Sequence, residues 1–188
     1  VEACKKTMRK AVGTSTFVSM AMNKDEPKIE GVNLGDSGYL ILRGKKALFH
    51  SPVQQHRFNH PYQCGTNHKL PHAAEAFPHP VQDGDLVVMA SDGLWDNLSD
   101  DQVIKEISEC QPITARQSGE VSVGYPIQDE TLLFSKCLAH KAHYYSQQRA
   151  YNSPFAQGAK EAGKMYLGGK EDDITVMVGK VLLANQAK

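Results

Sequence analysis

Acidic side chains stand next to apolar, strand-like segments at three places in this 188-residue sequence. Asp92 follows Val-Val-Met-Ala almost directly, Asp172 stands just before Ile-Thr-Val-Met-Val, and Asp36 lies in the turn-like Gly-Asp-Ser-Gly. A carboxylate at a strand end is held on rigid backbone, and a neighbouring glycine leaves room for a ligand. Carboxylates that converge repel one another unless a cation lies among them. Oxygen ligands suit magnesium or manganese better than zinc, so these acids predict a hard-metal site.

Each acid also has a purely structural interpretation. An Asp-Gly pair after a strand commonly forms a turn, and Gly-Asp-Ser-Gly is typical of a hairpin connection. The acidic run before Ile174 fits the solvated start of an edge strand. Only the residues of the three segments and their order along the chain, taken together, favour a shared site.

The segments around these acids are expected to form antiparallel strands. Apolar and β-branched residues predict strands at 14–22, 29–34, 39–43, 47–50, 85–91 and 173–183. The first of these form a meander in which Gly-Asp-Ser-Gly is a hairpin turn. Residues 51–80 hold five of the nine prolines and five of the eight histidines, and they predict a long loop or flap.

Helices are expected between the later strands. Ser99 has the side chain of an N-cap for a helix from Asp100 to about Cys110, whose acidic first turn suits the helix dipole. A longer helix is expected at 130–148, and another opens at Ser153-Pro154. Trp95 is expected to pack in the core.

Composition excludes several function classes. The net charge is zero and the basic residues are dispersed, so no nucleic-acid surface is predicted. No apolar run reaches the ~20 residues of a membrane span, and no signal-peptide pattern is present. We therefore expect a soluble protein without a membrane partner. We also expect a monomer.

The remaining chemistry-bearing residues predict no further site. The four cysteines, at 4, 64, 110 and 137, form no Cys-x-x-Cys pair, and we expect them to be reduced and structural. The histidines form no His-Glu-x-x-His pattern, and the acids near Asp92 do not have the spacing of a calcium-binding loop.

Three segments together resemble the metal-dependent type 2C serine/threonine protein phosphatases. They are Gly35-Asp36-Ser37, Ser91-Asp92-Gly93-Leu94-Trp95-Asp96 and Asp172-Asp173-Ile174-Thr175-Val176, in the order of the family pattern. Further segments, Gln-Gln-His-Arg-Phe-Asn-His-Pro-Tyr-Gln and Ser-Pro-Phe-Ala-Gln-Gly-Ala-Lys-Glu-Ala-Gly, look like the branch that includes mitochondrial members. The resemblance covers nearly the whole chain, so residues 1–188 are expected to be part of one catalytic domain with a flap-like loop at about 51–80.

The resemblance implies a fold and a chemistry. The fold is α+β, a four-layer α/β/β/α sandwich with a central pair of antiparallel sheets. The chemistry is hydrolysis of phosphoserine or phosphothreonine in proteins by a water that two Mg²⁺ or Mn²⁺ ions activate. Carried over by residue, the resemblance implies that Asp92 and Asp172 ligate metal, that Asp36 helps to bind a weaker additional ion, and that Asp173 makes hydrogen bonds around the site.

The sequence departs from the family at its beginning. Family members carry an upstream Asp-Gly-x-Gly-Gly segment and a phosphate-binding arginine, whereas the Asp-Gly pairs here are Asp83-Gly84 and Asp92-Gly93. This favours a fragment whose first residues, Val1 to Lys10, end a helix already under way, and we expect the chain alone to hydrolyse phosphopeptides poorly. The alternative is a catalytically inactive, phosphatase-like binding or regulatory module. The compartment stays open; an intracellular, mitochondrial location is an association only.

Overall fold

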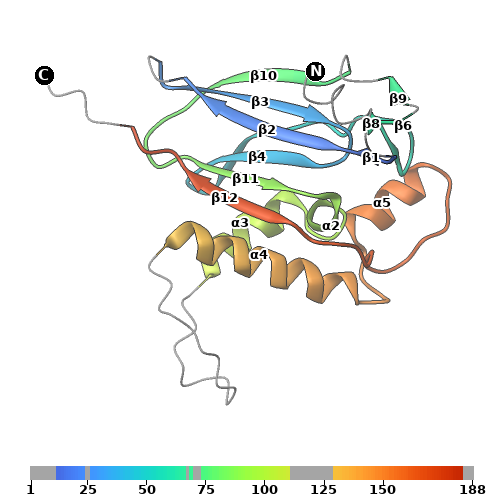
Figure 1. Ribbon diagram of the computed structural model, residues 1–188. Coiled ribbons are helices and arrows are strands. Elements are labelled where there is room, and N and C mark those ends of the chain that lie inside the picture. The colour runs from blue at the N-terminus through green and yellow to red at the C-terminus, as the bar shows by residue number, and fades with distance from the viewer. Residues whose placement is uncertain (1–11, 24–25, 67, 70–72, 111–128, 184–188) are drawn as a thin grey trace, which may run out of the picture.

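The computed structural model describes residues 12–23, 26–66, 68–69, 73–110 and 129–183. Two antiparallel sheets lie face to face, and helices cover the face of the β12-β11-β4-β5 sheet that points away from the other sheet (Figure 1). The outer sheet has the strand order β10-β3-β2 and the middle sheet the order β12-β11-β4-β5. The predicted α+β class with paired antiparallel sheets is confirmed, and the described residues supply three of its four layers. No described helix is long and apolar enough to cross a bilayer.

The element bounds follow most of the predicted segments closely, although the last strand is shorter than the predicted 173–183. The outer sheet contains β2 (Phe17–Met22), β3 (Lys28–Leu34) and β10 (Glu75–Pro80), and the middle sheet contains β4 (Gly38–Arg43), β5 (Lys46–His50), β11 (Leu86–Ala90) and β12 (Val176–Lys180). Short strands β1 (Thr14–Ser15), β8 (Cys64–Gly65) and β9 (His68–Lys69) form one small sheet, and β6 (Gln55–Arg57) pairs with β7 (His60–Pro61). The described helices are α2 (Asp92–Trp95), α3 (Asp100–Glu109), α4 (Glu130–Ser146) and α5 (Pro154–Glu161).

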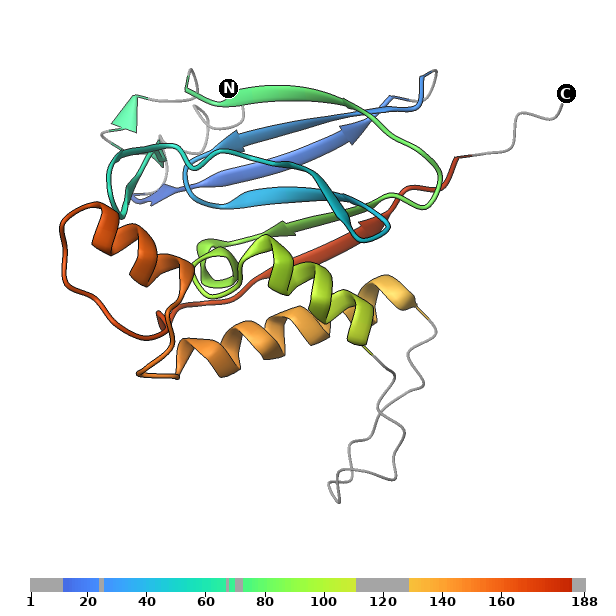
Figure 2. The ribbon, with the colours of Figure 1, turned by 180° about the vertical axis from the view of Figure 1, so that it is seen from behind.

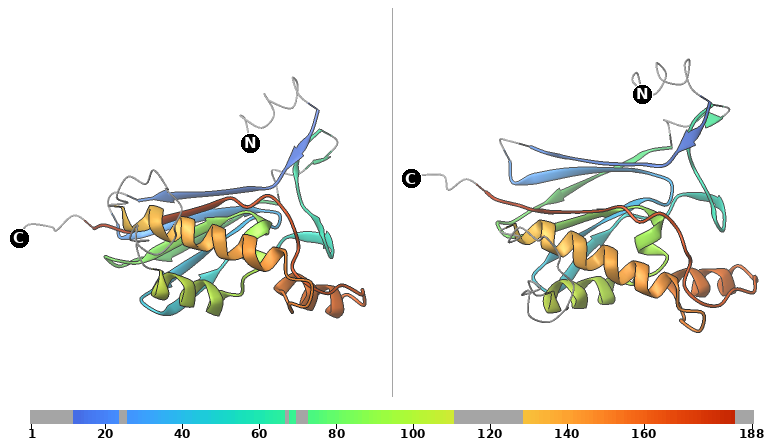
Figure 3. Two further views of the ribbon diagram at one scale, coloured as in Figure 1. Left: turned by 90° about the horizontal axis from the view of Figure 1, so that it is seen from below. Right: turned by 60° about the horizontal axis from the view of Figure 1, so that its bottom comes forward.

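Strand β4 is buried on both faces because it lies in the middle layer. Leu40 and Leu42 point toward the helices, where they belong to the same apolar cluster as Leu138 of α4. Tyr39 and Ile41 point the other way, into the core between the sheets. Figures 2 and 3 show α3 and α4 along the outer face of the middle sheet. This alternation explains the continuous apolar run of β4.

The expected hairpin around Asp36 is wrong. Strands β3 and β4 belong to different sheets, so Gly-Asp-Ser-Gly carries the chain from the outer sheet to the middle one. β4 pairs with β11 and β5 in the middle sheet, where the helices bury one of its faces and the outer sheet buries the other. The sheets meet closely there, because a β-carbon on Gly31 would overlap the ring of Tyr39.

The expected flap is also wrong over its last six residues. These residues form β10, which pairs antiparallel with β3 from Glu75 to Pro80. Strand β10 is the edge of its sheet. Proline lacks a backbone N–H and is accommodated at such an edge, so Pro78 did not exclude a strand.

The prediction of reduced cysteines is wrong as well. Cys110 at the end of α3 forms a disulfide with Cys137 of α4, with a Cα–Cα distance of 6.2 Å, and Cys64 is also disulfide-bonded. The packing of α3 against α4 brings the pair together across 27 residues of sequence. Sequence spacing alone gives no sign of such a contact.

Replacement of Cys110 by serine should lower the free energy of unfolding by about 3 to 4 kcal/mol, because the open chain regains the entropy of a closed loop of this size. Urea unfolding measures this loss. Cys137→Ser should give the same loss, and Ser108→Ala on the exposed side of α3 should change little. A Cys110→Ser protein as stable as the parent would show that the bond does not persist in solution.

Candidate metal centre

Strand register brings acids from three chain segments to one end of the middle sheet. Ala90, the last residue of β11, lies opposite Gly38, the first of β4, and opposite Val176, the first of β12. Asp92 therefore leaves the sheet where the segment carrying Asp36 and the segment carrying Asp172 enter it. The convergence expected from sequence is observed for these three carboxylates.

Ser91 and Gly93 hold the segment before β12 against the start of α2. The Ser91 hydroxyl donates to the Asp173 carbonyl at 3.1 Å and accepts from the Thr175 N–H at 3.0 Å. A β-carbon on Gly93 would lie 2.5 Å from the same carbonyl oxygen, so only glycine permits this approach. Asp173 contributes this contact through its backbone carbonyl, and the residue is otherwise exposed.

An ammonium lies among the carboxylates. The Nζ atom of Lys170 is 2.6 Å from Asp96 Oδ2, 2.9 Å from Asp92 Oδ2 and 3.1 Å from Asp172 Oδ2. With Asp36 beside them, four carboxylates and one ammonium give a formal charge of −3. Within the described part of the chain, no three His, Cys, Asp or Glu side chains are already arranged around a metal position. The lysine is the cation of this cluster.

Buried Asn97 fixes the backbone of Lys170. Its amide nitrogen donates to the Lys170 carbonyl at 2.8 Å, and its side-chain oxygen accepts from the Lys170 N–H at 2.9 Å. The same amide nitrogen also donates to the carbonyl of Gly93 at 3.0 Å. One side chain thus ties the Lys170 segment to α2.

Burial and mutual repulsion shift two acids of the cluster, Asp36 and Asp96, toward the neutral form. The pKa of Asp36 is raised, first by burial and then by the charge of Asp92. Burial raises the pKa of Asp96 to about 6, although Lys170 opposes this shift. For Lys170 itself, burial disfavours the charge, but Asp96 and Asp92 outweigh it and raise the pKa. These shifts indicate an excess of negative charge in a partly buried place.

Comparisons with known proteins relate the chain to named phosphatases. No family model matches the chain. The protein phosphatase PTC7 homolog of Danio rerio is 32% identical over 179 residues, 90% of this chain and 56% of that protein. The probable protein phosphatase 2C 80 of Arabidopsis thaliana is 38% identical over 178 residues, 92% of this chain and 38% of that protein. The chain is related to the type 2C protein phosphatases.

Solved structures agree with this assignment. The X-ray structure of the photosystem II phosphatase PBCP is 26% identical, with a TM-score of 0.75, and the match covers 92% of this chain and 66% of that one. The catalytic domain of the phosphatase PstP in complex with 2 manganese ions shares the fold, at 16% identity and a TM-score of 0.57 over 96% of this chain and 64% of that one. The chain spans 56% of the length of the Danio rerio relative and 38% of the length of the Arabidopsis thaliana relative. It is related to the PTC7 branch of these phosphatases.

The acidic residues of the cluster have the chemistry to hold a hard divalent cation. Three carboxylate oxygens already surround one positive charge, and a fourth carboxylate lies close enough for its pKa to respond to Asp92 and Asp172. Carboxylate oxygens are the donors that magnesium and manganese prefer. Asp96 and Lys170 were not among the residues predicted for the site. Asp96 belongs to the matched motif, and Lys170 precedes Asp172 by two residues, so both could have been suspected.

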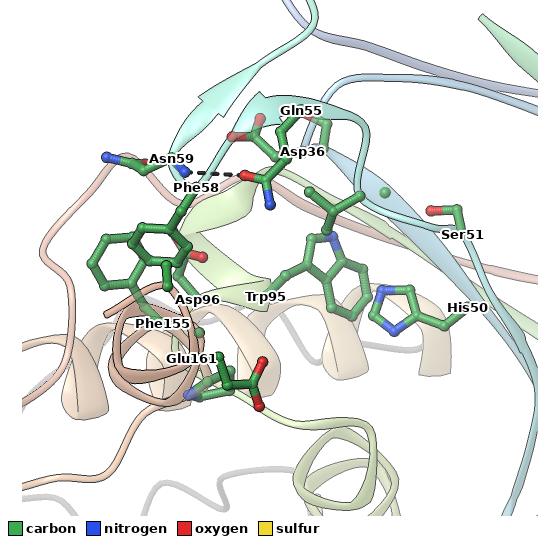
Figure 4. A pocket seen from close by; sticks show the side chains of 16 residues that line it. Asp36, His50, Ser51, Gln55, Phe58, Asn59, Trp95, Asp96, Phe155 and Glu161 are labelled. Atoms are coloured by element: carbon green, nitrogen blue, oxygen red, sulfur yellow. Dashed lines mark hydrogen bonds between the residues drawn. The ribbon is translucent and has the colours of Figure 1, made fainter. Parts of the chain in front are cut away.

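A pocket of about 570 Å³ opens beside the acids, between the 51–59 segment and α5. Figure 4 shows Asp36 and Asp96 near the aromatic pair Phe58 and Phe155, whose ring centroids are 5.0 Å apart. Trp95, which is buried as predicted, forms another part of the wall. Among the described residues, the lining contains acids and aromatic rings but no lysine or arginine.

Proposed function

We propose that the intact protein containing this chain hydrolyses phosphoserine and phosphothreonine in proteins and depends on Mg²⁺ or Mn²⁺. The proposal assigns metal binding to Asp92 and Asp172, with a weaker contribution from Asp36 and with Asp96 beside them. The observation that carries it is the convergence of Asp92, Asp96 and Asp172 on a single positive charge. The family relation supports the same assignment.

The bound ions would lower the pKa of a coordinated water, so that hydroxide is available near neutral pH. The chain's own residues have the task of holding ions and substrate in place. Asp92 and Asp172 lie on two backbone segments that pack against each other through the Ser91 hydrogen bond and the close approach at Gly93. Such rigidity matters because reacting groups must be held within fractions of an ångström.

The pocket beside the acids is proposed to receive residues next to the phosphorylated side chain. Phe58 and Phe155 offer an apolar wall, while Asp36, Asp96 and Glu161 favour a basic residue over an acidic one. A protein substrate rather than a small phosphate ester is the proposed partner, because an open pocket of this size leaves room for several residues.

The test is phosphate release by the intact protein from a phosphothreonine peptide in the presence of Mn²⁺. A phosphotyrosine peptide of the same sequence is the matched control. We expect the phosphothreonine peptide to be hydrolysed at least tenfold faster. Hydrolysis of neither peptide, with the metal bound, would favour the alternative of an inactive binding module.

A mitochondrial location is proposed only on the strength of the PTC7-like resemblance. The disulfides point to an oxidising compartment, because persistent disulfides are rare where thiols are kept reduced.

A further inference from the structure

Lys170 is held in the carboxylate cluster from two directions. Its backbone is fixed by the two hydrogen bonds of Asn97, a side chain that is itself fully buried. Its side chain is only 16% exposed, and its ammonium contacts three carboxylates. A surface lysine that reached the acids by chance would have neither restraint. The position of this ammonium is thus a property of the fold.

We propose that Lys170 is a built-in counter-cation, which neutralises the carboxylates in the metal-free protein and competes with divalent cations for Asp92, Asp96 and Asp172. This inference rests on the proposed metal centre and goes beyond it, because it names the residue that sets how tightly the centre binds metal.

Geometry makes the two cations mutually exclusive. An ammonium donates three hydrogen bonds and here finds three carboxylate oxygens at 2.6 to 3.1 Å. A magnesium ion requires its oxygen ligands at about 2.0 to 2.1 Å and would need those same oxygens. An ion therefore enters only when the Lys170 ammonium withdraws.

The lysine has a place to withdraw to. Its Nζ lies 5.0 Å from the ring centroid of Phe155, on the pocket side of the cluster. A four-carbon stem on a fixed backbone can swing the charge away from Asp92 and Asp172 while it keeps the aromatic face as a partner. The exchange replaces the single charge of the ammonium by the double charge of the metal ion in a cluster whose formal charge, with the ammonium present, is −3. A divalent ion at sufficient concentration therefore displaces the ammonium.

The test compares Lys170→Met with the parent in the intact protein. Methionine keeps an unbranched stem and removes the charge. We expect the Kd for Mn²⁺ in calorimetric titration to fall about tenfold, because no ammonium must be displaced. In EDTA the variant should melt at a lower temperature than the parent, because its carboxylates repel one another without a cation, and Mn²⁺ should remove this difference.

Lys164→Met is the matched control. Lys164 lies in the same connection before β12 and stacks on Phe58 with 5.4 Å from Nζ to the ring centroid, but it makes no ion pair with any described residue. This variant should leave both the Mn²⁺ affinity and the melting temperature in EDTA unchanged. Equal Mn²⁺ affinity of the parent and Lys170→Met would overturn the proposal for Lys170 and leave the proposed metal centre standing. Failure of both proteins to bind Mn²⁺ would overturn the metal centre itself.

A second measurement needs no variant. Acetylation of Lys170 by an amine-reactive reagent, followed by mass spectrometry of its peptide, reports how accessible the ammonium is. We expect Mg²⁺ to raise the acetylation rate of Lys170 several-fold and to leave that of Lys164 unchanged. An unaltered or slower rate at Lys170 in saturating Mg²⁺ would contradict its displacement.

Discussion

Phosphate release by the intact protein should stop when EDTA removes its divalent metal. The proposed ligands are a few carboxylates at one end of a sheet, and hard ions held by carboxylates and water exchange readily with solvent. The assay follows phosphate release from a phosphothreonine peptide before and after chelation. Excess Mg²⁺ or Mn²⁺ should restore the activity, which excludes loss through unfolding. Full activity in excess EDTA would rule out metal-dependent hydrolysis.

Replacement of Asp92 by asparagine should reduce turnover and metal affinity by at least about 10- to 100-fold. Changes around metal ligands already have effects of this size, and the loss of a ligand should have no smaller one. The fold should persist, because among the described residues the Asp92 carboxylate forms its hydrogen bond and ion pair with Lys170 alone, and asparagine keeps the shape of the side chain.

Asp101→Asn is the matched control for that experiment. It makes the same chemical change in the exposed first turn of α3, away from the cluster, and should change turnover little. A loss of less than about threefold for Asp92→Asn at saturating metal would assign Asp92 to a structural turn.

The strands and their acids were predictable because local pattern determines them. The apolar run before Asp92 was predicted as a strand and forms β11, and of the predicted strand at 173–183 the structure has Val176–Lys180 as β12. The Ser99 cap was also visible in sequence, and the structure adds a capping box in which Gln102 returns the hydrogen bond. Such features depend on residues a few positions apart.

Features that depend on distant packing were not predictable. A turn such as Gly-Asp-Ser-Gly fits a hairpin or a crossing between sheets, and only the two-sided burial of β4 decides between them. The Cys110–Cys137 bond depends on how α3 lies against α4. Lys170 is an ordinary lysine in sequence, and its role appears only when Asn97, 73 positions away, fixes its backbone.

Mn²⁺ titration of the intact protein and its Asp92→Asn variant tests the central claim, that these carboxylates form a metal centre, without reference to any substrate. We expect saturable binding by the parent and at least about tenfold weaker binding by the variant, while Asp101→Asn binds as the parent does. Equal Mn²⁺ affinity of all three proteins would place the metal elsewhere and contradict the account.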